Sequence, residues 1–217
     1  MRLVTISAQY GAGGSTIAPA VAAALGVPFV DRAIPVQVAR ALGVSTEESL
    51  AHDDRAETRW VSRWLAGAAR VAAVTSTVPT VPSDGASGAL LSDEAFVAHT
   101  ERVIRGLATS TGAVVLGRAA AIVLGSRPGT LHVRLHGPRD RRLEHAMESR
   151  GIDAVTAQRE MTAADRARAA YVKRFYRCDP DDAAHYHLVC DSTALPPAAV
   201  VDLITVAARA LPEKREG

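Results

Sequence analysis

The chain has 217 residues, of which 48% are hydrophobic, so it is long enough to bury a sizeable core in one α/β domain. Its 25 basic and 23 acidic residues give a net charge of +2, which argues against a dedicated nucleic-acid or membrane-surface protein with a basic stripe. The two cysteines indicate a reducing compartment rather than a disulfide framework. There is no signal-peptide pattern and no apolar run near the ~20 residues of a membrane span, so a cytoplasmic protein is expected.

The chain begins with a strand and a helix on either side of a glycine-rich turn. "LVTIS", residues 3–7, is short, apolar and β-branched, which predicts a buried strand of a parallel sheet. The helix after the glycines ends at Gly26, and "VPFV", residues 27–30, is predicted as a second strand. Residues 45–92 are predicted as a mainly helical insert, with a mobile Ser-, Thr- and Pro-rich loop over 75–92.

The second half of the chain alternates between predicted helices and strands. The predicted helices are residues 93–109, an arginine-rich segment over 139–174, and 197–211; the predicted strands are 113–117, 130–135 and 187–190. This alternation predicts a parallel sheet covered by helices on both faces. In such sheets, ligands bind at the carboxyl ends of the strands, where the glycine-rich turn lies.

That turn, "AQYGAGGS" over residues 8–15, matches the phosphate-loop pattern G-x-x-x-x-G-K-[ST] in part. Gly13 and Ser15 fit the pattern, but Ala8 stands in place of the first glycine and Gly14 in place of the lysine. The remaining chemistry is that of the backbone, because glycines and a helix start direct N–H groups at an anion. The alternative is a tight turn capped by Ser15, without a ligand.

Further motifs follow in order along nearly the whole chain: "QYGAGG", "FVDRA", "LGR", "RPGTLHVR", "DRAR" and "LVCDSTALPPAAVVDLI". Together they resemble the cytidylate kinase family, and most closely its branch without the lysine, the cytidylate kinase-like proteins. The resemblance implies the P-loop nucleoside monophosphate kinase fold. This fold is a three-layer α/β structure with a central parallel five-stranded sheet, helices on both faces, a helical acceptor-binding insert and an arginine-bearing lid. The single domain 1–217 would then divide into a core (1–44, 93–145 and 186–217), the insert 45–92 and the lid region 146–185.

The resemblance also implies an activity, the transfer of the γ-phosphoryl group of ATP to a nucleoside monophosphate, nominally CMP or dCMP, with Mg²⁺. This reaction needs no general base, because the attacking phosphate oxygen is already anionic; catalysis is positioning and charge neutralisation. The partners would be ATP and a small phosphorylated acceptor, and a homo-oligomer is compatible with the sequence. Two alternatives stay open: a nucleotide-binding protein without catalysis, and a kinase of a different small metabolite.

Site roles follow from the resemblance one residue at a time. Arg118 would bind the acceptor phosphate, with Arg32 as a further acceptor-binding candidate. Asp165 and Arg168 lie three residues apart on one helix face, and would hold the acceptor and close over the phosphates. Arg166 would reach the donor phosphates. The donor phosphates would be bound by the residues of the turn itself: Gly11, Ala12, Gly13, Gly14, Ser15 and Thr16. Ser15 is also the candidate Mg²⁺ ligand.

The chain also departs from the family pattern at charged positions. Leu116 and Ala119 replace aspartates of bacterial cytidylate kinases, and the second of these aspartates helps to recognise cytosine. Met161 replaces a lid arginine. We expect Arg168 to take over the task of the missing lysine, since an arginine from a mobile element stabilises a transferring phosphoryl group.

Two other patterns have simpler interpretations. Arg139 and Arg142 are interpreted as parts of a solvated helix face. A zinc site of Cys178, His185, His187 and Cys190 is disfavoured, because a buried strand would direct His187 and Cys190 to opposite sides.

Overall fold

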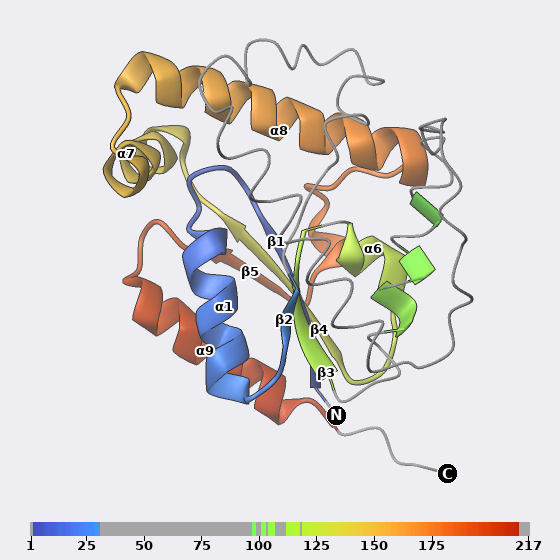
Figure 1. Cartoon of the computed structure of the whole chain (residues 1–217). Helices are drawn as coiled ribbons and strands as arrows, with labels where there is room; N and C mark the ends of the chain where they lie inside the picture. The colour runs from blue at the N-terminus through green and yellow to red at the C-terminus, as the bar shows by residue number, and fades with distance from the viewer. Residues whose placement is uncertain are drawn as a thin grey trace, which may run out of the picture.

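The computed structural model describes residues 2–30, 97–98, 101–102, 104–106, 112–117 and 119–212. In this part of the chain, one parallel sheet of five strands has the order β2-β3-β1-β4-β5 (Figure 1). The strands are β1 (Arg2–Ala8), β2 (Phe29–Val30), β3 (Gly112–Leu116), β4 (Thr130–His136) and β5 (Leu188–Asp191). The predicted α/β fold with a central parallel five-stranded sheet is therefore confirmed.

Helices lie on both faces of the sheet and across its carboxyl end. Helices α1 (Gly14–Leu25) and α9 (Pro197–Ala210) lie side by side on one face, and α6 (Ala120–Leu124) lies on the other. Helix α7 (Arg139–Arg150) follows β4, and the long helix α8 (Ala154–Tyr176) crosses above the carboxyl ends of the strands (Figure 1). A short 3₁₀ helix, Ala183–His185, precedes β5.

The central strand β1 is buried on both faces, as its sequence predicts. Val4 and Ile6 pack into the main core beneath α1 and α9, whereas Leu3 packs with Val115 on the opposite face. Polar side chains share that opposite face, where the Thr5 hydroxyl hydrogen-bonds His132 Nδ1 of β4 at 2.7 Å. The sheet therefore has an apolar face beneath α1 and α9 and an opposite face on which apolar and polar side chains mix.

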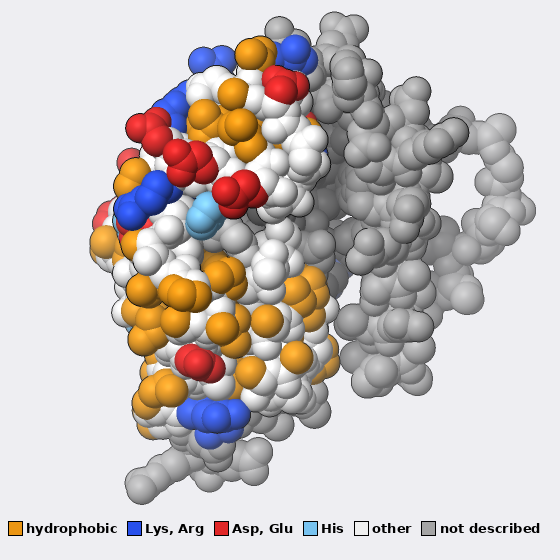
Figure 2. All heavy atoms as spheres, turned by 90° about the vertical axis from the view of Figure 1, so that its left-hand side faces the viewer, with side chains coloured by type: hydrophobic (Ala, Val, Ile, Leu, Met, Phe, Trp, Pro, Cys, Tyr) orange, Lys and Arg blue, Asp and Glu red, His pale blue; other side chains and the backbone are white. Residues whose placement is uncertain are grey.

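The charged and apolar surfaces separate on one side of the molecule. Figure 2 shows charged side chains gathered in the upper region, where α7 and α8 lie, and hydrophobic side chains over α1 and α9 below. Among the described helices, none combines the length and apolar character that a membrane crossing requires.

Most predicted elements agree with the structure to within a few residues. The arginine-rich segment 139–174 differs, because it is two helices: α7 ends at Gly151, whose φ is +65°, and Asp153 then caps α8 by accepting a hydrogen bond from Thr156 N at 2.9 Å. Helix α6 was not predicted. The predicted helix 93–109 is described only at residues 97–98, 101–102 and 104–106, which are helical. The insert 45–92 and its loop 75–92 lie outside the described residues.

Candidate functional site at the phosphate loop

The turn between β1 and α1 has a left-handed backbone at two glycines. Gly11 has a φ of +77° and Gly13 a φ of +71°, a region that favours glycine. Gly13 is the N-cap of α1 and makes no side-chain capping bond, and Gly14 is the first helical residue. The interpretation of this turn as one capped by Ser15 is therefore wrong, since Ser15 already lies inside the first helical turn.

The turn leaves a group of backbone N–H donors available at the start of α1. Within it, Ala12 N donates to Gln9 O at 3.1 Å and Thr16 N to Gly13 O at 3.0 Å. The N–H groups of Gly11, Gly13, Gly14 and Ser15 make no hydrogen bond to any residue that the structure describes. Successive free N–H groups at a helix start form a binding site for phosphate oxygens.

The position of the missing lysine has no room for a side chain. A Cβ added to Gly14 would lie 2.5 Å from the Cβ of Ala8 and 3.3 Å from Leu116 Cδ1. All three residues are buried where β1, β3 and α1 meet. The two departures from the phosphate-loop pattern are therefore linked, because the methyl group of Ala8 occupies the space that a side chain at position 14 would need.

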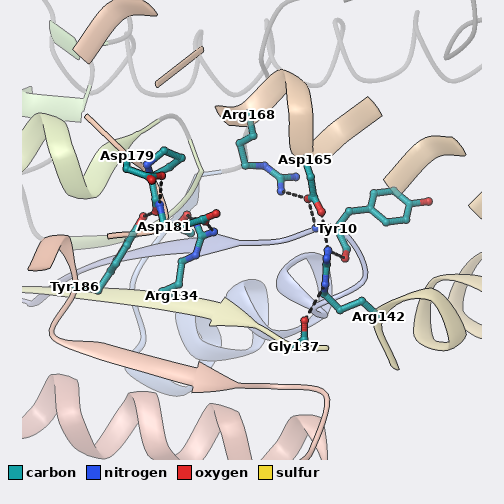
Figure 3. A network of polar contacts seen from close by, with 11 residues as sticks. Tyr10, Arg134, Gly137, Arg142, Asp165, Arg168, Asp179, Asp181 and Tyr186 are labelled. Carbon is teal, nitrogen blue, oxygen red and sulfur yellow. Dashed lines mark hydrogen bonds and ion pairs between the residues drawn. The ribbon is translucent and has the colours of Figure 1, made fainter. Parts of the chain in front are cut away.

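Helix α7 packs directly on this loop. A Cβ on Gly11 would collide with the backbone carbonyl of Arg142. The Arg142 side chain is only 8% exposed; its Nη1 donates to Tyr10 O at 2.9 Å and to Asp165 Oδ2 at 2.7 Å, and its Nε donates to Gly137 O at 3.0 Å (Figure 3). The interpretation of Arg142 as part of a solvated face is therefore wrong.

Helix α8 contacts the same loop through Asp165. Its Oδ1 accepts a hydrogen bond from Tyr10 N at 3.1 Å, and also pairs with Arg168 Nη1 at 3.2 Å. The predicted pairing of Asp165 and Arg168 along one helix face is thus confirmed (Figure 3). Arg166 is exposed on the same helix.

The side chain of Tyr10 forms a second link between the loop and these helices. Its hydroxyl donates to Glu160 Oε2 at 2.5 Å and accepts from Arg150 Nη1 at 2.5 Å. Arg150 also forms an ion pair with Glu160, and its guanidinium lies 5.9 Å from the centre of the Tyr10 ring. Burial raises the pKa of the Tyr10 phenol, so the hydroxyl stays protonated at neutral pH.

The segment after β5 holds the loop from the other side. Ser192 Oγ donates to Ala12 O at 2.8 Å, and Arg141 Nη2 donates to Asp191 Oδ2 at 2.6 Å. Hydrogen bonds from Thr193 lower the pKa of Asp191, and the nearby Arg141 lowers it further, so this carboxylate is ionised at neutral pH. The loop is therefore fixed between α7, α8 and the end of β5.

A separate polar cluster joins the segment after α8 to the sheet. The buried Arg134 of β4 donates to Ser7 Oγ at 3.0 Å, forms an ion pair with Asp181, and lies 5.7 Å from the centre of the Tyr186 ring (Figure 3). This cluster anchors the end of the predicted lid region, away from the N–H groups of the loop.

The structure thus places Asp165 against the loop at Tyr10, next to the predicted residues 11–16, and Arg168 beside Asp165. Arg118 and Arg32 lie outside the described residues, so their positions remain predictions. Arg142 was missed as a site residue. The sequence spacing could have indicated its burial, because Arg142 lies four residues before Ala146 and therefore on the same, buried side of α7.

Among the described residues, no three or more His, Cys, Asp or Glu side chains are placed so that they could hold a metal ion together. The four residues considered for zinc therefore do not form such a group. His187 Nδ1 instead accepts a hydrogen bond from His132 N at 3.0 Å. For Mg²⁺, the exposed Ser15 hydroxyl makes no hydrogen bond within the described part of the chain. One such protein ligand fits Mg²⁺, which usually keeps phosphate oxygens and water in its other positions.

Known proteins resemble this chain in sequence and in fold. The sequence model of the cytidylate kinase-like family matches residues 3–194. A uronate isomerase of Corynebacterium glutamicum is 33% identical over 97 residues, which are 45% of this chain but only 19% of the length of that relative. Among solved structures, an uncharacterized protein from Eubacterium ventriosum has a TM-score of 0.64 at 16% identity, covering 97% of this chain and 99% of that one. Shikimate kinase from Acinetobacter baumannii, in complex with shikimate, has a TM-score of 0.47 at 13% identity, with 98% and 96% covered.

Proposed function

The chain belongs to the cytidylate kinase-like family, and we propose that it transfers the γ-phosphoryl group of ATP to a small acceptor, nominally CMP or dCMP. The observation that carries this proposal is the group of N–H donors of Gly11, Gly13, Gly14 and Ser15 at the start of α1. These donors suit the donor phosphates, since the helix start adds a partial positive charge. Mg²⁺, held by Ser15, would neutralise charge on the phosphates when bound.

Arginine from helix α8 supplies the positive charge that the loop lacks. Position 14 has no room for lysine, whereas Arg168 lies on the face of α8 that contacts the loop through Asp165. An arginine carried by a lid element stabilises a transferring phosphoryl group well. Arg166 is proposed to reach the donor phosphates from the same helix, and Arg118 and Arg32 to bind the acceptor.

A kinase acting on another small metabolite is the second candidate, and one comparison favours it. The relative that shares a segment with this chain is, by its name, an isomerase of uronates, which are hydroxylated sugar acids. An acceptor of that class would offer a carboxylate that an arginine binds in two places. The replacement of aspartates by Leu116 and Ala119 is consistent with an acceptor that carries no cytosine.

Substitution of Arg168 tests the proposal. We expect Arg168→Ala to lower the rate of phosphoryl transfer by about 10³-fold, the lower end of the effect of a phosphate-stabilising arginine, while the fold is kept. The measurement is ADP formation from ATP with CMP, dCMP, other nucleoside monophosphates and uronates, and circular dichroism reports the fold. Arg139→Ala is the matched control, because this exposed arginine contacts only Thr162 among the hydrogen bonds described.

The acceptor panel separates the candidates. Transfer to CMP or dCMP supports the first candidate, and transfer to a uronate alone supports the second. ATP binding without transfer to any acceptor would instead indicate a nucleotide-binding protein without catalysis, and full activity of Arg168→Ala would exclude the role of that residue.

A further inference from the structure

Helix α8 is hydrogen-bonded to the phosphate loop at Tyr10, through its backbone N–H as well as through its hydroxyl group. The N–H of Tyr10 donates to Asp165 Oδ1 at 3.1 Å, and its carbonyl accepts from Arg142 Nη1 at 2.9 Å. The same Nη1 donates to Asp165 Oδ2 at 2.7 Å, which closes the ring of contacts (Figure 3). Loop, α7 and α8 therefore meet in one hydrogen-bonded unit.

The burial of Arg142 makes this unit interdependent. Its side chain is 8% exposed, whereas that of Asp165 is 30% exposed. A guanidinium so far removed from water requires a carboxylate and further acceptors, and the loss of one partner leaves a buried charge uncompensated. A separation of α8 from the loop would remove Asp165, and Arg142 would keep only the carbonyls of Tyr10 and Gly137 among its described partners.

Asp165 also contacts Arg168. The oxygen that accepts from Tyr10 N is the one that pairs with Arg168 Nη1 at 3.2 Å. Asp165 thus faces the protein with both oxygens: Oδ1 towards the loop and Arg168, Oδ2 towards Arg142. Its carboxylate is already used by these groups, which differs from the role expected from the family resemblance, direct contact with the acceptor.

We propose that Arg142 and Asp165 are positioning residues that couple the seating of α8 to the anion-binding form of the phosphate loop. Asp165 acts through Tyr10 and Arg168, not on the acceptor. The inference rests on the proposed function in that ATP is taken as the ligand of the loop. Coupling between two sites is reciprocal. If the seated form of α8 strengthens the binding of a ligand to the loop by some factor, the bound ligand stabilises the seated form of α8 by the same factor.

The test compares Asp165→Asn and Arg142→Lys with the wild-type chain. Asparagine keeps an oxygen for the N–H of Tyr10 but loses the negative charge, and lysine keeps the positive charge but loses the fork of donors. The control is Asp181→Asn, which removes the charge from another ion pair at the far end of the same region, with Arg134. All four chains are first compared by thermal unfolding.

Two measurements follow, the affinity for a non-hydrolysable ATP analogue with Mg²⁺ and the hydrogen exchange of residues 154–176. In the wild type and in Asp181→Asn, the analogue should slow exchange in α8. In Asp165→Asn and Arg142→Lys, we expect about tenfold weaker binding of the analogue, and little slowing of exchange in α8. In steady-state kinetics, the KM for ATP should rise and the KM for the acceptor should stay unchanged.

The outcomes distinguish this inference from the proposed function. If the wild type binds the analogue and both variants bind it equally well, or if Asp165→Asn raises only the acceptor KM, the inference is wrong and the proposed function stands. If the wild type binds no nucleotide, the proposed function fails, and the same comparison is made with pyrophosphate as the loop ligand. A chain that binds neither overturns both.

Discussion

At the scale of single residues, the central feature is the pair Ala8 and Gly14. Their side-chain positions compete for one space, with a separation of 2.5 Å between the Cβ of Ala8 and a Cβ built on Gly14. A lysine placed at position 14 alone would therefore not restore an ordinary phosphate loop. In the proposed function, the loop binds phosphate through its backbone N–H groups, and the cations come from other elements.

This linkage predicts the stability of variants at the two positions. Gly14→Lys should lower the free energy of unfolding by about 1–3 kcal/mol, the usual cost of overpacking, because the methyl group of Ala8 is rigidly held by β1. The double variant with Ala8→Gly should recover most of that loss. Chemical denaturation of both variants and of Ala8→Gly alone measures the effect. A Gly14→Lys chain as stable as the wild type would show that the two positions are independent.

At the scale of elements, the strands could be predicted from the sequence, whereas the contacts of the loop with α7 and α8 could not. Buried parallel strands such as Leu3–Ser7 are apolar and β-branched, and this pattern is local in sequence. The hydrogen-bond partners of Arg142 are distant in sequence, since Tyr10 is 132 residues away and Asp165 is 23 residues away. Only the packing of α7 on the loop brings these residues together. Sequence therefore indicated the phosphate loop and the α8 pair, but it placed Arg142 in water.

The contact between β1 and β4 predicts a dependence of stability on pH. His132 is buried between the Thr5 hydroxyl and the Gly125 carbonyl, which Nε2 contacts at 2.7 Å. Burial lowers the pKa of His132, and the stacked ring of His187 lowers it further. The unfolded chain thus binds a proton more readily than the folded one, so stability should fall as pH decreases through the ordinary histidine range near 6.5.

Denaturation of the wild type and of His132→Asn at pH 7.5 and 5.5 measures this effect. The loss of stability between the two pH values should be smaller in His132→Asn, which carries no titratable group there. His145→Asn is the control, since His145 lies on α7 and is not part of the contact between β1 and β4. An equal loss in the wild type and in His132→Asn would mean that His132 does not cause the dependence.

At the scale of the whole molecule, the three-layer arrangement directs several segments to one edge of the sheet. Four segments meet there: the loop after β1, the start of α7, the segment after β5 and the middle of α8. The loop and α8 are far apart in sequence, since Tyr10 and Asp165 are separated by 155 residues. Ligands of parallel sheets bind at this edge. A site without the lysine is thus surrounded by arginines from other elements.

The central claim is that the N–H groups at the start of α1 bind the phosphates of a nucleotide. The most direct measurement is the change in the ¹H–¹⁵N amide resonances as Mg²⁺ and an ATP analogue are added to the full chain. We predict saturable shifts of Gly11, Gly13, Gly14 and Ser15, larger than those of amides that already have partners, such as Ala12 and Ile17. Saturable binding that leaves those four resonances unchanged would contradict the account.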